Sequence, residues 1–122
     1  MIVLATDAPL SERQLRRVAA RAAFGLGRAG SFASNGSGEY ALAFSTAQRV
    51  PHSAEDAHAE FRFLRDDSPQ LRTLFESAAE ATHEAVLNSL CAAEAVEGRN
   101  DHRAEAFPHE LLVSVAGVTP LR

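Results

Sequence analysis

Lysine is absent from this chain of 122 residues, and all 12 of its basic side chains are arginines. We attribute this absence to coding bias rather than to function. Cysteine occurs once, as Cys91, so no disulfide can form within the chain and nothing demands an oxidising compartment. We therefore expect a cytoplasmic protein.

Long apolar runs are also missing, because no stretch approaches the roughly 20 residues that a membrane-spanning helix needs. The first residues form a short apolar run with no basic region before it, so we expect no signal peptide. The net charge of −4 argues against a nucleic-acid partner. A hydrophobic fraction of 46% and a charged fraction of 23% are typical of a soluble globular protein, here of one domain over residues 1–122.

The charges are unevenly spread along the chain. Basic and acidic side chains gather in two segments: Arg13, Arg16, Arg17, Arg21 and Arg28 in the first, and Glu55, Asp56, Glu60, Asp66 and Asp67 in the second. An arginine-rich helix face is most often solvated or paired with neighbouring acids, so we assign this one no function.

The first third of the chain predicts a strand followed by a helix. Residues 1–6 are apolar and rich in β-formers, which indicates a buried strand. Ser11 and Gln14 have the spacing of a capping box, in which each side chain bonds the other's backbone amide. The apolar stripe that follows has helical spacing and consists of Leu15, Val18, Ala19, Ala22, Leu26 and Ala29. Gly30 ends this helix.

The middle of the chain is less regular. Residues 31–39 are small, polar and glycine-rich, which predicts a loop, and residues 40–46 predict a second strand. Residues 48–67 form a long connection without clear periodicity. Within this connection, residues 60–64 (EFRFL) fit either a short strand or a helical turn.

A second helix of about 30 residues follows. Ser68 is its expected N-cap, Pro69 occupies the first helical position, and Gly98 ends it. We expect residues 99–107 to be extended and residues 108–116 to form a short final helix. Two strands and three helices define an α/β protein. Two strands are too few for an independent sheet, so we expect another polypeptide to supply the missing strands.

Two motifs match known sites without the context that these sites need. Residues 25–30 read G-x-G-x-x-G, but the glycines fall at the end of a helix rather than between a strand and a helix, so we reject a dinucleotide site. His83 and Glu84 are followed by Leu87 where a zinc site needs a second histidine. We expect His83 to lie on a helix surface.

Other side chains that could bind metal or react are weak candidates. His52, Asp56 and His58 are loosely spaced in an irregular loop with no cysteine nearby. Cys91 is predicted to be a small core residue rather than a nucleophile. We therefore expect neither a metal nor a cofactor.

The segment NGSGEY, residues 35–40, supports two interpretations. Asn, Gly and Ser favour turns, so a simple turn accounts for its composition. Alternatively, flanking glycines leave the Ser37 hydroxyl open to a ligand. If a strand begins at Glu39, that carboxylate lies near the hydroxyl and can orient it or accept a proton.

Three segments together resemble a known family. ATDAPLSERQLRRVAARAAFGLGRAGS, NGSGEYALAFSTA and LNSLCAAEAVEGR resemble, in order and spacing, the C-terminal or β portion of the P1 family of serine aminopeptidases, peptidase family S58. That family includes the L-aminopeptidase/D-esterases and the β-peptidyl aminopeptidases. The resemblance covers nearly the whole chain.

This resemblance implies a precursor that cleaves itself by autoproteolysis into an α and a β chain. The new N-terminal serine or threonine of the β chain is the nucleophile, and its amino group can act as the base. The two chains form a four-layer α-β-β-α sandwich like that of the ornithine acetyltransferases. Members assemble into homo-oligomers. The resemblance therefore implies a partner α chain, which would complete the sheet.

The resemblance also implies site residues. Ser37 matches the serine of the family motif and would hydrogen-bond the nucleophile or the incoming amine, while Glu39 matches the acid that assists proton transfer. The family's nucleophile aligns just before Met1, which has neither hydroxyl nor thiol. We therefore expect these residues alone to be inactive.

The resulting function is a serine aminopeptidase or amidase that hydrolyses N-terminal aminoacyl amides, esters or peptides with a free amino terminus. Two alternatives stay open. One is an acyltransferase of the ornithine acetyltransferase type. The other is an inactive truncated fragment that only oligomerises.

Overall fold

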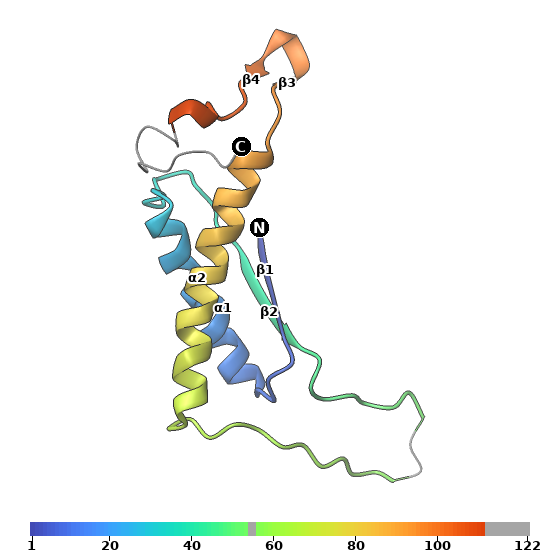
Figure 1. The fold of residues 1–122 in the computed structure, drawn as a ribbon. Coiled ribbons are helices and arrows are strands. Elements are labelled where there is room, and N and C mark those ends of the chain that lie inside the picture. Colours follow the sequence, from blue (N-terminus) through green and yellow to red (C-terminus); the bar gives the residue numbers. More distant parts are fainter. Residues whose placement is uncertain (54–55, 112–122) are drawn as a thin grey trace, which may run out of the picture. The chain divides into compact units, whose positions relative to one another are not determined.

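The computed structural model describes residues 1–53 and 56–111. The chain divides into two compact units, residues 1–84 and residues 85–122, which we describe separately. The elements, labelled in Figure 1, are β1 (Ile2–Thr6), α1 (Glu12–Arg28), β2 (Ala41–Ser45), α2 (Pro69–Ala92), β3 (Val96–Glu97), a 3-10 turn (Arg99–Asp101) and β4 (Arg103–Ala104). In the described part, no helix has the length and apolar character needed to cross a membrane.

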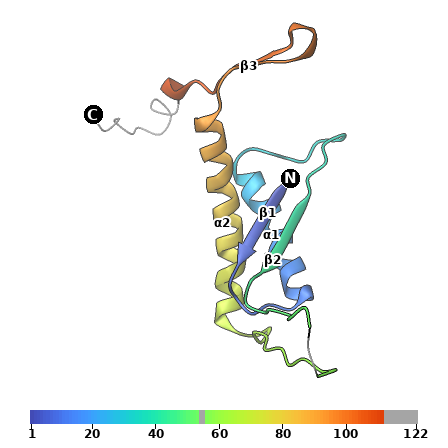
Figure 2. The same ribbon diagram turned by 90° about the vertical axis from the view of Figure 1, so that its right-hand side faces the viewer.

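Both predicted strands of the first unit form, and they pair in parallel. Ile2 lies opposite Ala41 and Thr6 lies opposite Ser45. The prediction that residues 1–6 are a buried strand is wrong for one face: Leu4 is half-buried, whereas Val3 remains 54% exposed. The reason is that, among the described residues, helices cover only one face of this two-stranded sheet (Figures 1 and 2).

Helix α1 begins and ends as its sequence predicts. The Ser11 hydroxyl accepts a hydrogen bond from the Gln14 amide, and the Gln14 side chain accepts one from the Ser11 amide at 3.0 Å, which confirms the capping box. The chain leaves the helix through Gly30, whose φ of +97° is in the left-handed region that favours glycine. The predicted stripe is buried at Val18 and Ala22.

Helix α2 starts where expected but ends early. The Ser68 hydroxyl accepts a hydrogen bond from the Leu71 amide at 3.3 Å, which confirms the N-cap. The predicted end at Gly98 is wrong, because the helix stops at Ala92. Beyond it, Val96 and Glu97 pair with the antiparallel strand β4, and this ladder replaces the last expected helical turn.

The core of the first unit lies between the two helices and the inner face of the sheet. Leu10 and Val18 meet Leu71 and Ala78 there, and Leu4 of β1 packs against them. The helices and the sheet therefore form one α layer on one β layer, as Figures 1 and 2 show from two sides.

The irregular segments and the C-terminal part of the chain differ from what the sequence predicts. Residues 60–64 form neither strand nor helical turn. Residues 99–107 are not simply extended, since they contain the 3-10 turn and β4. Of the helix expected over residues 108–116, only 109–111 are described as helical, and residues 112–116 lie outside the described part. The mixed α/β class is confirmed, while the four-layer sandwich, the partner chain and a single domain over residues 1–122 stay predictions.

Candidate functional site

The glycine-rich segment before β2 forms a tight turn. The Ser37 amide donates a hydrogen bond to the Ser34 carbonyl at 2.9 Å, which closes a four-residue turn around Asn35 and Gly36. Gly36 has a φ of +93°, the conformation that the third position of a type II turn requires. All residues of this loop are exposed. The sequence-based expectation of a turn is confirmed.

The same turn brings the two predicted site residues together. The Ser37 hydroxyl donates a hydrogen bond to a Glu39 carboxylate oxygen, with 2.5 Å between the two oxygens. Both side chains are exposed, so solvent or another polypeptide can reach them. A hydroxyl whose proton points at a carboxylate turns its lone pairs outward, where they can accept a proton or a hydrogen bond from a third group.

Backbone pairing connects this pair to the start of β1. The Ile2 amide donates to the Tyr40 carbonyl at 2.8 Å, and Ile2 lies opposite Ala41. By the same register Met1 lies beside Tyr40, and a strand continued backwards would bring the next two residues opposite Glu39 and Gly38. Neighbouring strands are about 4.8 Å apart. A residue that continued β1 backwards before Met1 would therefore lie within side-chain reach of the Ser37–Glu39 pair.

The weaker candidates do not assemble into a second site. Asp56 accepts a hydrogen bond from the His58 amide at 2.9 Å, and both side chains are exposed. Within residues 1–53 and 56–111, no three His, Cys, Asp or Glu side chains gather closely enough to hold a metal ion. The expectation of no metal and no cofactor stays a prediction. His83 is half-buried rather than fully on the surface.

Cys91 corrects a prediction. The sequence predicts it in the core, but it is a free and exposed thiol in the last turn of α2. The helical spacing that suggested burial continues through this turn, yet residues 87–92 are all exposed. Periodicity identifies a helix face, whereas burial depends on what packs against that face.

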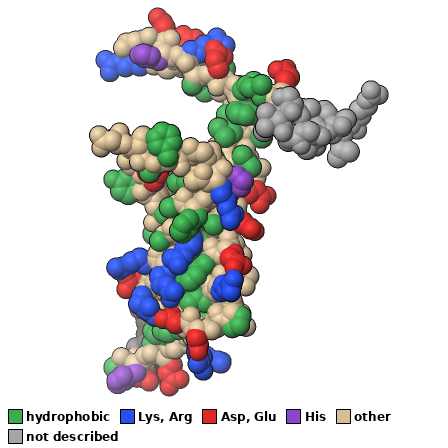
Figure 3. All heavy atoms as spheres, turned by 90° about the vertical axis from the view of Figure 1, so that its left-hand side faces the viewer, with side chains coloured by type: hydrophobic (Ala, Val, Ile, Leu, Met, Phe, Trp, Pro, Cys, Tyr) green, Lys and Arg blue, Asp and Glu red, His purple; other side chains and the backbone are tan. Residues whose placement is uncertain are grey.

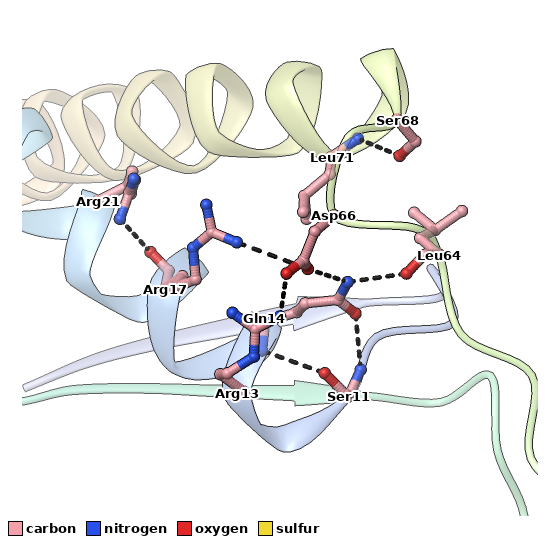
Figure 4. Close-up of polar contacts among 9 residues, drawn as sticks. All are labelled: Ser11, Arg13, Gln14, Arg17, Arg21, Leu64, Asp66, Ser68 and Leu71. Atoms are coloured by element: carbon pink, nitrogen blue, oxygen red, sulfur yellow. Dashed lines mark hydrogen bonds and ion pairs between the residues drawn. The ribbon is translucent and has the colours of Figure 1, made fainter.

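Asp66 forms a polar cluster that the sequence did not indicate (Figure 4). Its carboxylate accepts a hydrogen bond from Arg13 and another, at 2.8 Å, from the buried Gln14 side chain, and Arg17 lies 3.6 Å away. These hydrogen bonds, from Arg13 first and Gln14 second, hold the pKa of Asp66 below its ordinary value, and the two arginine charges act in the same direction. Gln14 also donates to the Leu64 carbonyl at 2.8 Å.

Two arginines on the same face of α1 also contact an aromatic ring of α2. The guanidinium groups of Arg17 and Arg21 lie 4.8 and 4.1 Å from the centre of the Phe75 ring on α2. Figure 3 shows basic side chains interspersed with acidic and hydrophobic ones on this side of the molecule. The prediction that such a face is paired or solvated is confirmed for Arg13 and Arg17.

Comparison with known proteins extends this description. The model of peptidase family S58 matches residues 1–104. The chain is 42% identical over 116 residues to the beta-peptidyl aminopeptidase BapA of Sphingosinicella xenopeptidilytica, and the match covers 94% of this chain and 28% of that protein. The chain thus spans less than a third of the length of this relative.

Solved structures share the fold. The PH0078 protein from Pyrococcus horikoshii OT3 superimposes with a TM-score of 0.85 at 46% identity, over 93% of this chain and 32% of the other. The L-aminopeptidase D-Ala-esterase/amidase from Ochrobactrum anthropi, described as a variant of the Ntn hydrolase fold, gives a TM-score of 0.84 at 37% identity, over 95% and 32% of the two chains.

Proposed function

Since the chain belongs to peptidase family S58, we propose that it is the C-terminal portion of a serine aminopeptidase that hydrolyses N-terminal aminoacyl amides, esters or peptides. The observation that carries this proposal is the hydrogen bond from Ser37 to Glu39 just before β2, next to the point where the Tyr40 carbonyl accepts a hydrogen bond from the first residue of β1. Aminopeptidases among its relatives support the reaction class.

The proposed nucleophile is a hydroxyl on a residue before Met1. Its oxygen attacks the carbonyl carbon of the substrate's first residue, while its proton passes to a nearby base such as its own amino group. The proton then goes to the departing amine, and an ester is left on the enzyme. Water hydrolyses this ester and regenerates the hydroxyl. Hydrogen-bond donors stabilise the oxyanion of each tetrahedral intermediate.

Within this mechanism Ser37 and Glu39 act as a relay. Ser37 can accept a hydrogen bond from the nucleophile's hydroxyl or amine because its own proton is directed at Glu39. Glu39 holds the Ser37 hydroxyl in that orientation and stabilises positive charge on the amine while it carries the proton. Residues 1–122 contain the relay but, under this proposal, not the nucleophile, so by themselves they are inactive.

A partner chain is part of the proposal. Val3, Leu42 and Phe44 lie on the sheet face that the helices do not cover, and they are 54%, 56% and 45% exposed. An apolar sheet face of this kind is normally covered in a folded protein. We propose that the α portion of the same precursor covers it with a second sheet, which gives the four-layer sandwich, and that the αβ units form a homo-oligomer in the cytoplasm.

The test uses the full-length protein, with its self-cleavage followed by mass spectrometry and amine release measured from aminoacyl p-nitroanilides. We expect Ser37→Ala and Glu39→Gln to lower kcat about 100-fold or more, the usual contribution of a positioned acid or base. Ser34→Ala is the matched control, because Ser34 lies in the same loop and contributes only its backbone carbonyl.

Three outcomes would contradict the proposal. Wild-type rates in both Ser37→Ala and Glu39→Gln would remove the assigned site. Transfer of an acetyl group from acetylornithine to glutamate, without amine release, would favour the acyltransferase alternative. A full-length protein that neither cleaves itself nor releases amine would favour the inactive fragment.

A further inference from the structure

The turn that carries Ser37 is held by few contacts. Within the described chain it is closed by one backbone hydrogen bond, which the Ser37 amide donates to the Ser34 carbonyl. All residues from 31 to 40 are exposed, so little of the described structure packs against the turn. A strained backbone persists only where its surroundings over-determine it. The shape of this turn therefore depends on the residues within it.

Gly36 has a backbone angle that glycine adopts more readily than other residues. Its φ of +93° is in the left-handed region that the third position of a type II turn requires. Apart from its chain neighbours, a Cβ built on Gly36 would meet no described atom within 4 Å. An alanine there would thus be opposed by its own backbone angle and not by crowding. Asparagine would be opposed less, because it tolerates a positive φ.

The two side chains of the proposed site are fixed from opposite ends. Glu39 precedes Tyr40, whose carbonyl accepts a hydrogen bond from the Ile2 amide at 2.8 Å, so the sheet holds the backbone on this side. Ser37 is held on the other side by the turn that its amide closes. The hydrogen bond of 2.5 Å from the Ser37 hydroxyl to the Glu39 carboxylate joins the two ends. The angle at Gly36 therefore determines where the hydroxyl lies relative to the carboxylate.

We propose that Gly36 is a positioning residue, whose left-handed backbone rather than its small size holds the Ser37 hydroxyl against the Glu39 carboxylate. The inference rests on the aminopeptidase function proposed above and adds to it a residue that acts only through Ser37. It has two consequences. A residue that tolerates a positive φ can replace Gly36, and replacing Gly36 has no effect once the Ser37 hydroxyl is gone.

The experiment measures kcat of the full-length protein on alanine p-nitroanilide, per molecule of self-cleaved enzyme counted by mass spectrometry. Gly36→Ala should lower kcat about tenfold, because alanine disfavours a left-handed backbone by roughly that factor in population. Gly36→Asn should stay within about threefold of wild type. An equal loss in Gly36→Asn and Gly36→Ala would overturn the inference, because side-chain size and not φ would then matter.

A double-mutant cycle tests whether Gly36 acts through Ser37. In a Ser37→Ala background, Gly36→Ala should change kcat by less than about twofold, since no hydroxyl is left to position. A purely structural role would lower kcat by the same factor in both backgrounds. That result would show that Gly36 does not act through the Ser37 hydroxyl, and the inference would be wrong.

Gly30 provides the matched control. Its φ is +97°, and apart from its chain neighbours a Cβ there would also meet no described atom within 4 Å. Gly30 lies at the end of α1, outside the turn that carries Ser37. Gly30→Ala introduces the same kind of strain, so it should lower the unfolding midpoint and leave kcat within about twofold of wild type. A tenfold lower kcat in Gly30→Ala would contradict a specific role for Gly36.

Failure to fold and failure of the proposed function are both distinguishable. If Gly36→Ala does not fold or cleave itself, Gly36→Asn decides: a kcat near wild type supports the inference, and a variant that is equally defective refutes it. If wild type neither cleaves itself nor releases amine, the aminopeptidase function is wrong. If Ser37→Ala lowers kcat and Gly36→Ala does not, the function stands and only the role of Gly36 is wrong.

Discussion

At the scale of single residues, Gln14 does more than its capping role suggests. It is 3% exposed, completes the capping box, and donates to the Leu64 carbonyl and the Asp66 carboxylate. Gln14→Ala should lower the free energy of unfolding of the full-length protein by about 1–3 kcal/mol, because buried partners lose their hydrogen bonds. Urea unfolding measures this change. Gln70→Ala, an exposed position, should change it by less than about 0.5 kcal/mol.

The contact between Gln14 and the Asp66 carboxylate depends on pH. The folded-state pKa of Asp66 is below the value of about 3.9 expected in an unfolded chain. Its contribution to stability is therefore fully present above about pH 4 and is lost as pH falls through the folded pKa. Asp66→Asn should lower the unfolding midpoint at pH 7, and the difference from wild type should shrink at acidic pH.

A neighbouring carboxylate provides the comparison for Asp66. Asp67 is exposed and bonds only Arg65, two residues earlier, at 2.7 Å. Asp67→Asn should therefore leave the unfolding midpoint nearly unchanged at pH 7. If Asp66→Asn lowers the midpoint equally at pH 7 and at pH 3, the ionised carboxylate is not the stabilising species.

At the scale of elements, the approach of α1 to α2 depends on Gly25. A Cβ on Gly25 would lie 2.4 Å from the Ala79 carbonyl oxygen and 2.7 Å from the Thr82 Cβ, which no rotamer change can relieve. Gly25→Ala should therefore lower the free energy of unfolding by about 1–3 kcal/mol or more, the range that overpacking usually causes. Thermal unfolding of the full-length protein measures the loss.

Gly27, one half-turn away on the same helix, is the matched control. A Cβ there meets no described atom within 4 Å. Gly27→Ala should stabilise the helix by about 0.5–1 kcal/mol, since alanine has the higher helix propensity. A destabilised Gly27→Ala variant or an unaffected Gly25→Ala variant would show that α1 does not approach α2 at Gly25 as described.

At the scale of the whole molecule, the uncovered sheet face determines how these residues behave alone. Residues 1–122 produced alone expose Val3, Leu42 and Phe44 together. We expect these residues alone to self-associate, because apolar patches of this kind promote aggregation. Light scattering after size-exclusion chromatography should show large species, and Leu42→Thr with Phe44→Thr should reduce them while keeping strand propensity. A monomeric preparation of residues 1–122 would contradict this expectation.

Local signals in the sequence determined the elements. The capping box at Ser11, the Ser68–Pro69 start and the left-handed Gly30 act within a few residues, so the starts of both long helices and the end of α1 could be predicted. The turn around Gly36 was predictable for the same reason. The proximity of Ser37 to Glu39 follows from that turn, and their proposed role came from the resemblance to a family.

Only the tertiary structure decided the contacts between distant segments. The burial of Gln14 depends on Leu64 and Asp66, some 50 residues later, and the pairing of β3 with β4 accompanies the early end of α2. The exposure of Cys91 and of the outer sheet face depends on what does or does not pack there. Periodicity specifies which face of an element is apolar, but burial is a property of two surfaces in contact, and a sequence read locally describes only one of them.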